Sequence, residues 1–201
     1  MELNFTSNIF FYNKAFNGGA LYLDDAPEID QDIRPITFIG NRFDNNIAED
    51  FGGAIYSGFS KMYTAIVSEN TFSNNSAGIM GGGIFSPKKV DKCIFKTIKE
   101  MSLVDNKVNS FENNYTSNPS YIKLLTTLSN PIIIKSGEYL PLSFGLYDEF
   151  DNYINDISAY YSSMNLKVSL ELKEGSNINN SENFVIKGNI GSFVNGIEKQ
   201  K

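Results

Sequence analysis

An internal repeat in the first 118 residues constrains the fold more than any other feature of this chain. Three segments share N-x-F-x-x-N-x-A followed, two or three residues later, by G-G-[AG]-[IL]-[YF]: residues 8–22 (NIFFYNKAFNGGALY), 41–56 (NRFDNNIAEDFGGAIY) and 70–85 (NTFSNNSAGIMGGGIF). A fourth segment, NSFENNYTSNP from Asn109, keeps the first half and lacks the glycines. Units this short cannot bury a face alone, so we expect them to stack into a solenoid.

Each part of the repeat has a physical interpretation. Alternation around the phenylalanine suits a strand with its ring on the core face. Asparagine tolerates left-handed backbone geometry and marks one corner, and a glycine pair permits positive φ or close backbone approach at a second corner. The residues assigned to these equivalent positions are Phe10, Asn13, Gly18, Gly19, Phe43, Asn46, Gly52, Gly53, Phe72, Asn75, Gly81, Gly82, Phe111 and Asn114.

Apolar, β-branched segments just upstream support the expectation of strands. These are ITFIG (36–40), TAIVS (64–68) and MSLVD (101–105). Insertions at 24–35 and 86–100 account for the unequal spacing of the units, and we expect loops there.

Stacked in register, such units form a parallel β-helix, because propeller blades need about 40 to 50 residues each and a leucine framework is missing. The pairing of F-x-N-N with G-G-A-[ILY] resembles the repeats of chlamydial-type polymorphic outer membrane proteins and, more broadly, the right-handed β-helices of the pectin-lyase-like superfamily. The resemblance implies an all-β chain with a short right-handed parallel β-helix of about three to four coils over residues 1–118. That superfamily includes lyases, hydrolases, adhesins and surface proteins, so the resemblance implies a fold rather than an activity.

The sequence pattern changes in residues 119–201, where the repeat is absent and apolar segments without a helical period are separated by Pro119, Pro131 and Pro141. Such a strand set indicates an immunoglobulin-like β-sandwich, held in whole or in part. The stretch SGEYLPLSFGLYDEFDNYI resembles a hairpin of filamin-like and bacterial Ig-like modules, and the combination with the solenoid resembles large cell-surface proteins of ciliated protozoa. We expect strands near Tyr121–Thr127, Ile132–Ile134, Leu140–Tyr147, Leu166–Leu172 and Phe184–Ile190.

Composition excludes several functions. The 17 basic and 23 acidic side chains give a net charge of −6, with no basic cluster for nucleic acid. Histidine is absent and Cys93 is the single cysteine, which removes His-based triads, the usual zinc sites and an intramolecular disulfide. No apolar run approaches the roughly 18 residues of a membrane span. We therefore expect no cofactor, no nucleic acid and no membrane span within this segment.

Candidate sites favour structural interpretations. Asp148, Glu149, Asp151 and Asn152 could offer oxygen ligands to Ca²⁺, but a turn explains them equally well, and Cys93 reads as a small buried hydrophobe. We therefore predict no catalytic and no metal residue. Carboxylates that do not recur between coils, and so favour a solvated surface over catalysis, are Asp24, Asp25, Asp44, Glu49, Asp50 and Glu69. Sequons that permit glycosylation begin at Asn4, Asn74, Asn114 and Asn179.

The preferred hypothesis is a non-enzymatic structural or adhesive segment of an extracellular, membrane-anchored surface protein. Because the segment enters in the middle of a repeat, its expected partners are the rest of a larger parent chain and surface glycans or proteins. A carbohydrate-active enzyme would instead place two carboxylates about 5 to 10 Å apart on one groove. A carbohydrate-binding module would expose coplanar aromatic rings.

Overall fold

A computed structural model describes residues 3–25, 35–88, 94–129, 132–133, 135, 137–169, 190–194 and 196–200. Within these residues the regular structure is β, with short 3₁₀ segments η1 (Met62–Thr64) and η3 (Ile94–Glu100) and no α-helix. The chain divides into two compact units, each described by itself below. Unit 1 comprises Met1–Tyr121 with Tyr147–Asn152, and unit 2 comprises Ile122–Leu146 with Tyr153–Lys201.

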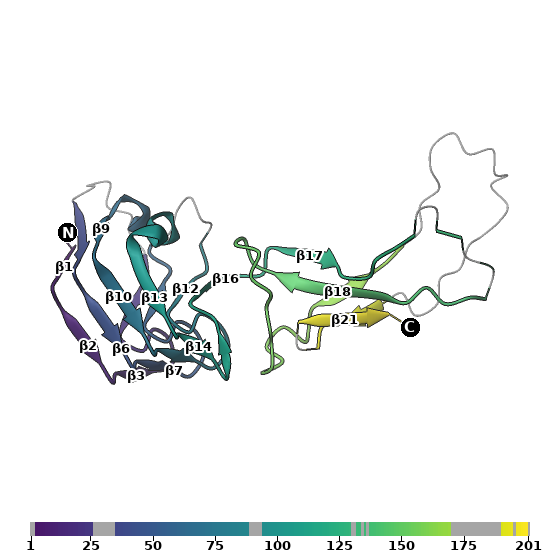
Figure 1. Ribbon diagram of the computed structural model, residues 1–201, viewed down its shortest axis with the longest axis horizontal. Coiled ribbons are helices and arrows are strands. Elements are labelled where there is room, and N and C mark those ends of the chain that lie inside the picture. The colour runs from purple at the N-terminus through teal and green to yellow at the C-terminus, as the bar shows by residue number, and fades with distance from the viewer. Residues whose placement is uncertain are drawn as a thin grey trace. The chain divides into compact units, whose positions relative to one another are not determined.

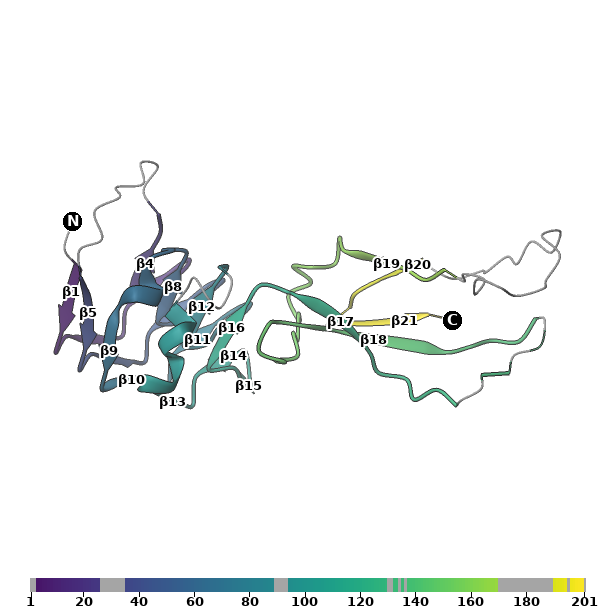
Figure 2. The same cartoon turned by 90° about the horizontal axis from the view of Figure 1, so that it is seen from above.

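Unit 1 is a parallel β-solenoid in which equivalent strands of successive coils pair into four sheets (Figures 1 and 2). The first sheet holds β1 (Leu3–Thr6), β5 (Ile36–Ile39) and β9 (Ile66–Ser68). The second holds β2 (Ile9–Phe11), β6 (Arg42–Asp44), β10 (Asn70–Ser73) and β13 (Met101–Val104). The third holds β3 (Lys14–Ala15), β7 (Ile47–Ala48), β11 (Ser76–Ala77) and β14 (Lys107–Val108), and the fourth holds β4 (Leu21–Leu23), β8 (Ile55–Ser57), β12 (Ile84–Ser86) and β16 (Tyr115–Ser117).

These strands form coil 1 (residues 3–23), coil 2 (36–57), coil 3 (66–86) and a partial coil 4 (101–117). Coil 4 has no strand in the first sheet and is preceded by η3 instead. The prediction of an all-β chain that begins with a short parallel β-helix is confirmed.

The solenoid core is a stack of phenylalanines. The rings of Phe10 and Phe43, and those of Phe43 and Phe72, lie 4.6 Å apart with interplanar angles of 5° and 2°. Phe43 and Phe72 are fully buried, and Ile55 and Ile84 fill the interior from the opposite sheet. Each aromatic pair contributes about 0.5–1.5 kcal/mol beyond its buried area, so the repeated phenylalanine stabilises coil stacking directly.

The assignment of the fourth repeat was wrong. Leu103, not Phe111, is the register partner of Phe72. Phe111 is 54 % exposed and lies on β15 (Phe111–Glu112), which forms an antiparallel hairpin with β14. The physical reason is that MSLVDNKV (101–108) already fills the strand and corner positions, with Leu and Val where the other coils have Phe and Ala. MSLVD is therefore the equivalent of the phenylalanine-bearing strands β6 and β10, and not of the strand upstream of them.

The expected loop at 86–100 is only partly a loop. Its last seven residues form η3, and Ile94 at the start of η3 is fully buried in the solenoid core. Residues 26–34 of the other insertion lie outside the described residues, as does Cys93. The buried-cysteine interpretation therefore stays a prediction.

Unit 2 contains two small sheets in its described part. One holds β17 (Tyr121–Leu124), β18 (Leu142–Tyr147) and β21 (Ile197–Gln200), and the other holds β19 (Asn165–Lys167) and β20 (Ile190–Ser192). The expected strand at 132–134 is wrong for Ile132 and Ile133, which are exposed and outside any strand. Most of the expected strand at 184–190 lies outside the described residues, and both the immunoglobulin-like sandwich and the boundary at 118/119 stay predictions.

Candidate functional site: the two ends of the solenoid

Both corners of coils 1 to 3, and the second corner of coil 4, carry an asparagine directly after a residue with left-handed backbone. The left-handed residues include Gly40 and Glu69 at the first corner and Asn45 and Asn74 at the second, with φ between 55° and 64°. Glycine and asparagine adopt this region at little cost, which explains part of the sequence pattern. The asparagines that follow form a first ladder of Asn8, Asn41 and Asn70 and a second ladder of Asn13, Asn46, Asn75 and Asn106.

The ladders are polar chains with a direction. The backbone N–H and the Nδ2 amide of Asn46 both donate to Oδ1 of Asn75 at 2.9 Å, and Nδ2 also donates to the carbonyl of Phe10 at 3.1 Å. The backbone N–H and one Nδ2 hydrogen therefore point to Oδ1 of the next coil, whereas the other Nδ2 hydrogen and the Oδ1 acceptor face the preceding coil. Because an unsatisfied buried amide costs about 1–3 kcal/mol, the ladder fixes both register and polarity.

The glycine pair answers two different requirements. Gly52 has φ +67°, a conformation that residues with a Cβ rarely adopt, and a Cβ added to Gly53 would overlap the carbonyl oxygens of Gly82 and Ser76. The first glycine therefore turns the chain, and the second lets neighbouring coils approach. The pairs at Gly18, Gly19, Gly81 and Gly82 follow the same division.

The C-terminal end of the second ladder is closed. Asn106 donates through its backbone N–H (3.2 Å) and Nδ2 (2.8 Å) to Oδ1 of Asn114. Asn114 then donates to Glu112 at 2.7 Å. Asn114, assigned above to a repeat corner, instead terminates the ladder from the β14–β15 hairpin side.

A turn from later in the chain covers the same end. Asp148 is fully buried, and its carboxylate accepts the backbone N–H groups of Ser117 (3.1 Å), Phe150 (2.9 Å) and Asn152 (2.9 Å). Asn152 Nδ2 donates to the carbonyl of Tyr115 at 3.0 Å, and the Phe150 ring packs on the core, edge-on to the Tyr115 ring at 5.1 Å. We name residues 148–152 the capping turn.

The chemistry of the capping turn does not resemble a calcium site. Burial raises the pKa of Asp148, although N–H donors from Ser117, Asn152 and Phe150 act in the opposite direction. Both carboxylate oxygens already accept hydrogen bonds from the protein. Among the described residues, no group of three or more His, Cys, Asp or Glu side chains is placed to hold a metal ion.

Coil 1, at the other end, is open. Its ladder residues Asn8 and Asn13 are exposed, whereas Asn41 at the equivalent position of coil 2 is only 1 % exposed. In coil 2 the N–H groups of Arg42 and Ile47 donate to the carbonyls of Asn8 and Asn13 at 2.9 Å. By the same register, the N–H groups of Ile9 and Lys14 point away from coil 2, and no described residue accepts them.

The outer surface of coil 1 is also more apolar than that of the later coils. Ile9 is 73 % exposed and Phe16 is 71 % exposed. The register partner of Ile9 in coil 2 is Arg42, and Thr71 follows in coil 3. We name four exposed apolar side chains on the second and third sheets of coil 1 and the turns beside them the coil-1 flank: Ile9, Phe11, Tyr12 and Phe16.

Several of the carboxylates considered for catalysis have structural partners. Asp44 is buried and accepts from Arg42 (3.0 Å) and Ser73 (2.9 Å). Desolvation raises the pKa of Asp44, but hydrogen bonds from Asn74, Ser73 and Arg42 outweigh it and lower that pKa.

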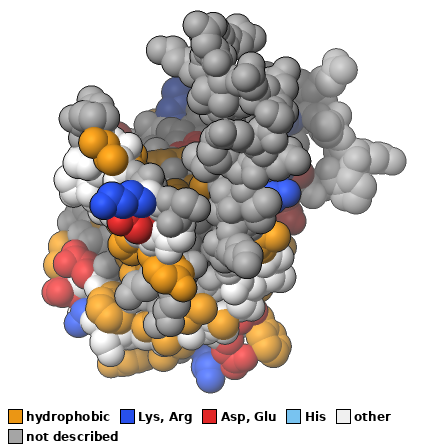
Figure 3. Space-filling view, turned by 90° about the vertical axis from the view of Figure 1, so that its right-hand side faces the viewer, with side chains coloured by type: hydrophobic (Ala, Val, Ile, Leu, Met, Phe, Trp, Pro, Cys, Tyr) orange, Lys and Arg blue, Asp and Glu red, His pale blue; other side chains and the backbone are white. Residues whose placement is uncertain are grey.

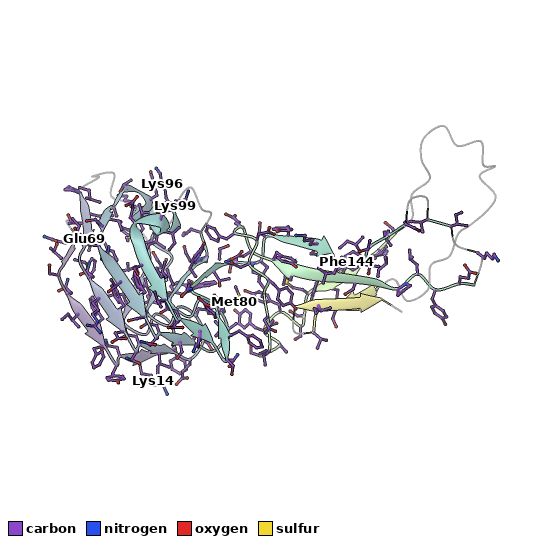
Figure 4. The ribbon with its side chains drawn as sticks, in the orientation of Figure 1. Lys14, Glu69, Met80, Lys96, Lys99 and Phe144 are labelled. Atoms are coloured by element: carbon purple, nitrogen blue, oxygen red, sulfur yellow. The ribbon has the colours of Figure 1, made fainter. Side chains whose placement is uncertain are left out.

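Two further candidates form ion pairs, Asp25 with Lys88 at 3.2 Å and Glu49 with Lys14 at 3.6 Å. Lys14 and Glu69 project outward from the solenoid (Figure 4). On the face drawn in Figure 3, basic and acidic side chains lie in small mixed groups.

The exposed aromatic rings of the fourth sheet stack on one another. Tyr22 and Tyr56 lie 4.7 Å apart at 6°, so each ring covers a face of the other. Phe85 continues the row at 5.5 Å and is buried. The arrangement differs from the coplanar platform expected of a carbohydrate-binding module.

The sequons fall in different environments. Asn4 and Asn74 are exposed, the former accepting the Thr6 hydroxyl and the latter donating to Asp44 at 3.3 Å. Asn114 is half-buried and bonded through both side-chain atoms. Asn179 lies outside the described residues.

These features define a parallel β-solenoid repeat protein of about three turns, with one closed and one open end. Residues 42–58 and 71–87 match the family model of the Chlamydia polymorphic membrane protein repeat. The matches fall on coils 2 and 3 of the solenoid and include the glycine pair of each. No curated protein and no solved structure is significantly similar to the chain. In the part of the chain that the structure describes, no helix has the length and hydropathy to cross a membrane.

Proposed function

We propose that the chain is a non-enzymatic structural and adhesive segment of an extracellular surface repeat protein. The solenoid acts as a spacer, and the coil-1 flank provides the contact. The matched repeat is described as one of polymorphic membrane proteins, which supports placement at a cell surface or outer membrane. The single observation that carries the adhesive part is the exposure of Ile9 and Phe16 on a coil whose neighbours present Arg42 and Thr71 in the same row as Ile9.

Exposed apolar side chains gathered on one coil favour contact with another surface, because the later coils show that this fold does not require them. Glycans and proteins displayed on a cell surface both offer apolar patches that such side chains bind. The rest of a longer parent chain would supply anchoring. The ion pairs of Asp25 and Glu49 and the hydrogen bonds to the buried Asp44 favour this function over a carbohydrate-active enzyme.

The test is a binding assay with the full chain on beads presented to whole cells. The double variant Ile9→Ser/Phe16→Ser should lose binding by about thirtyfold, since each of the two exposed apolar contacts contributes about 1 kcal/mol at an interface. Ile47→Ser removes an exposed apolar side chain from coil 2 and serves as the matched control. Equal binding by all three proteins contradicts the adhesive function, and cleavage of a polysaccharide by the purified chain contradicts the non-enzymatic one.

A further inference from the structure

We infer that the open edge of coil 1 is a binding surface for one further β-coil that carries asparagine at both of its corners. The inference deepens the proposed function, because it rests on the solenoid acting as a stacked spacer and names the partner of its free end. It is independent of the coil-1 flank, which faces outward rather than along the stack.

The first argument is continuity with the interface inside the molecule. Coil 1 presents to its open side the same elements that coil 2 presents to coil 1. These are an Oδ1 acceptor at each corner, outward N–H groups at Ile9 and Lys14, and the free ring faces of Phe10 and Tyr22. In coils 2 and 3 every one of these elements is matched by the preceding coil.

The second argument is the direction of the ladders. Asn41 donates its backbone N–H (3.0 Å) and Nδ2 (2.9 Å) to Oδ1 of Asn70. Oδ1 of Asn8 and of Asn13 is thus an acceptor shaped for two amide donors from one residue. An asparagine on the incoming coil supplies both donors with the right spacing. Its backbone carbonyl would accept the N–H of the coil-1 residue that follows the ladder asparagine, as the carbonyl of Asn8 accepts the N–H of Arg42, the residue after Asn41.

A second copy of this chain fits the edge less well. Two open ends facing each other would bring acceptor against acceptor at both ladders. The closed end of another copy offers the β14–β15 hairpin and the capping turn rather than a free row of asparagine donors. The surface therefore favours a coil of its own repeat type in the head-to-tail direction.

The experiment extends the chain with one such coil. Residues 36–64 are duplicated directly in front of Leu3, because Asn4 pairs with Thr37 and Thr37 pairs with Ile66, which places residue 64 just before the position equivalent to Leu3. The readout is hydrogen exchange at the amides of Ile9 and Lys14, measured by NMR. We expect exchange there to slow by about a hundredfold or more, since unpaired amides exchange freely and paired ones only on opening.

The matched control carries leucine at the copies of Asn41 and Asn46, which keeps the strands and removes the side-chain donors. This control should give less than about a tenth of the protection of the parent extension. Unchanged exchange in the parent extension overturns the inference, as does equal protection by the control. Dimers of the unextended chain with protected Ile9 and Lys14, detected by light scattering and exchange, overturn it in favour of a second copy. None of these outcomes depends on Ile9 or Phe16 side-chain contacts, so failure here is distinguishable from failure of adhesion.

Discussion

The two ends of the solenoid finish the same asparagine ladders in different ways. At the C-terminal end, Asn114 accepts the last donors of the second ladder, and the capping turn covers the core with Phe150. At the N-terminal end, Asn8 and Asn13 keep their acceptors in water. Edges of sheets are templates for further pairing unless something blocks them, and among the described residues such a block covers the C-terminal end of the solenoid and not the edge of coil 1.

The largest expected effect is the difference in stability lost when an asparagine is replaced inside the second ladder and at its exposed end. Asn46→Leu removes the acceptor of the Asn13 donors and the Nδ2 donor to the carbonyl of Phe10, and it leaves Oδ1 of Asn75 with only the backbone N–H of residue 46. We expect a loss of about 3 kcal/mol or more in the free energy of unfolding. Asn13→Leu, at the exposed rung, should cost about 1 kcal/mol, because water replaces the partner. Urea denaturation of both variants measures the difference, and equal losses would contradict the ladder as the source of stability.

The closed end is tested by removing the anchor of the capping turn. Asp148→Ala takes the acceptor from three backbone N–H groups, including that of Ser117 in β16. We expect a loss of about 2 kcal/mol and earlier hydrogen exchange in coil 4 than in coil 2. Glu149→Ala changes the exposed neighbour and should stay within about 0.5 kcal/mol of the parent protein. A uniform rise in exchange over all coils would show that residues 148–152 do not act as a local cap.

The acid sensitivity of coils 2 and 3 gives a smaller effect. The pKa of Asp44 in the folded protein lies below its ordinary value of 3.8. Its stabilisation is therefore complete above that value and lost as the pH falls through the folded pKa. Asp44→Asn should be less stable than the parent at pH 7 and show a flatter decline between about pH 4 and pH 2.

Thermal unfolding across this range measures the slopes of both proteins. Asp25, whose pKa is also lowered, contributes a residual slope of the same sign. Asp148 contributes the opposite sign, because its pKa is raised. Identical slopes for Asp44→Asn and the parent would show that the hydrogen bonds from Asn74, Ser73 and Arg42 do not lower the pKa of Asp44 in solution.

The solenoid could be predicted because the same sequence motif recurs in several coils. Phenylalanine and glycine recur where ring stacking and close coil contact demand those residues, as at Phe43 and Gly53. The second asparagine of the motif was predicted as a corner residue, whereas the corner position of the first asparagine and the hydrogen-bonded ladders formed by both were not predicted. A chain of side-chain amides shows only when the same residue is seen in adjacent coils, and the strict spacing of N-x-F-x-x-N was the signal that could have indicated it.

The fourth coil and the cap could not be predicted in the same way. In MSLVDNKV, Leu103 occupies the phenylalanine position and Val108 the alanine position of the repeat. Because the repeat was defined by its phenylalanine, the fourth unit was placed at Phe111 instead. The capping turn lies about thirty residues beyond the solenoid, and its contacts with Ser117 and Tyr115 connect segments that no local pattern links. Many different aromatic rings and many different acceptors for backbone N–H groups can close a solenoid end. The sequence signature of such a cap is therefore weak.

The smallest effect on stability concerns glycosylation at Asn74, at a corner of coil 3, and at Asn114, at the closed end. If the chain is expressed with a secretory leader in a glycosylating eukaryotic cell, Asn74 should carry a glycan at little cost, because it is exposed at a corner. Asn114 should yield folded protein only without a glycan, since its Nδ2 donates to Glu112 and its Oδ1 terminates the ladder. Mass spectrometry of the secreted, folded fraction checks both sites, with Asn74→Gln as the control for glycan mass. A glycan on Asn114 in that fraction would mean that the second ladder does not end there, and the closed end would then rest on the capping turn alone.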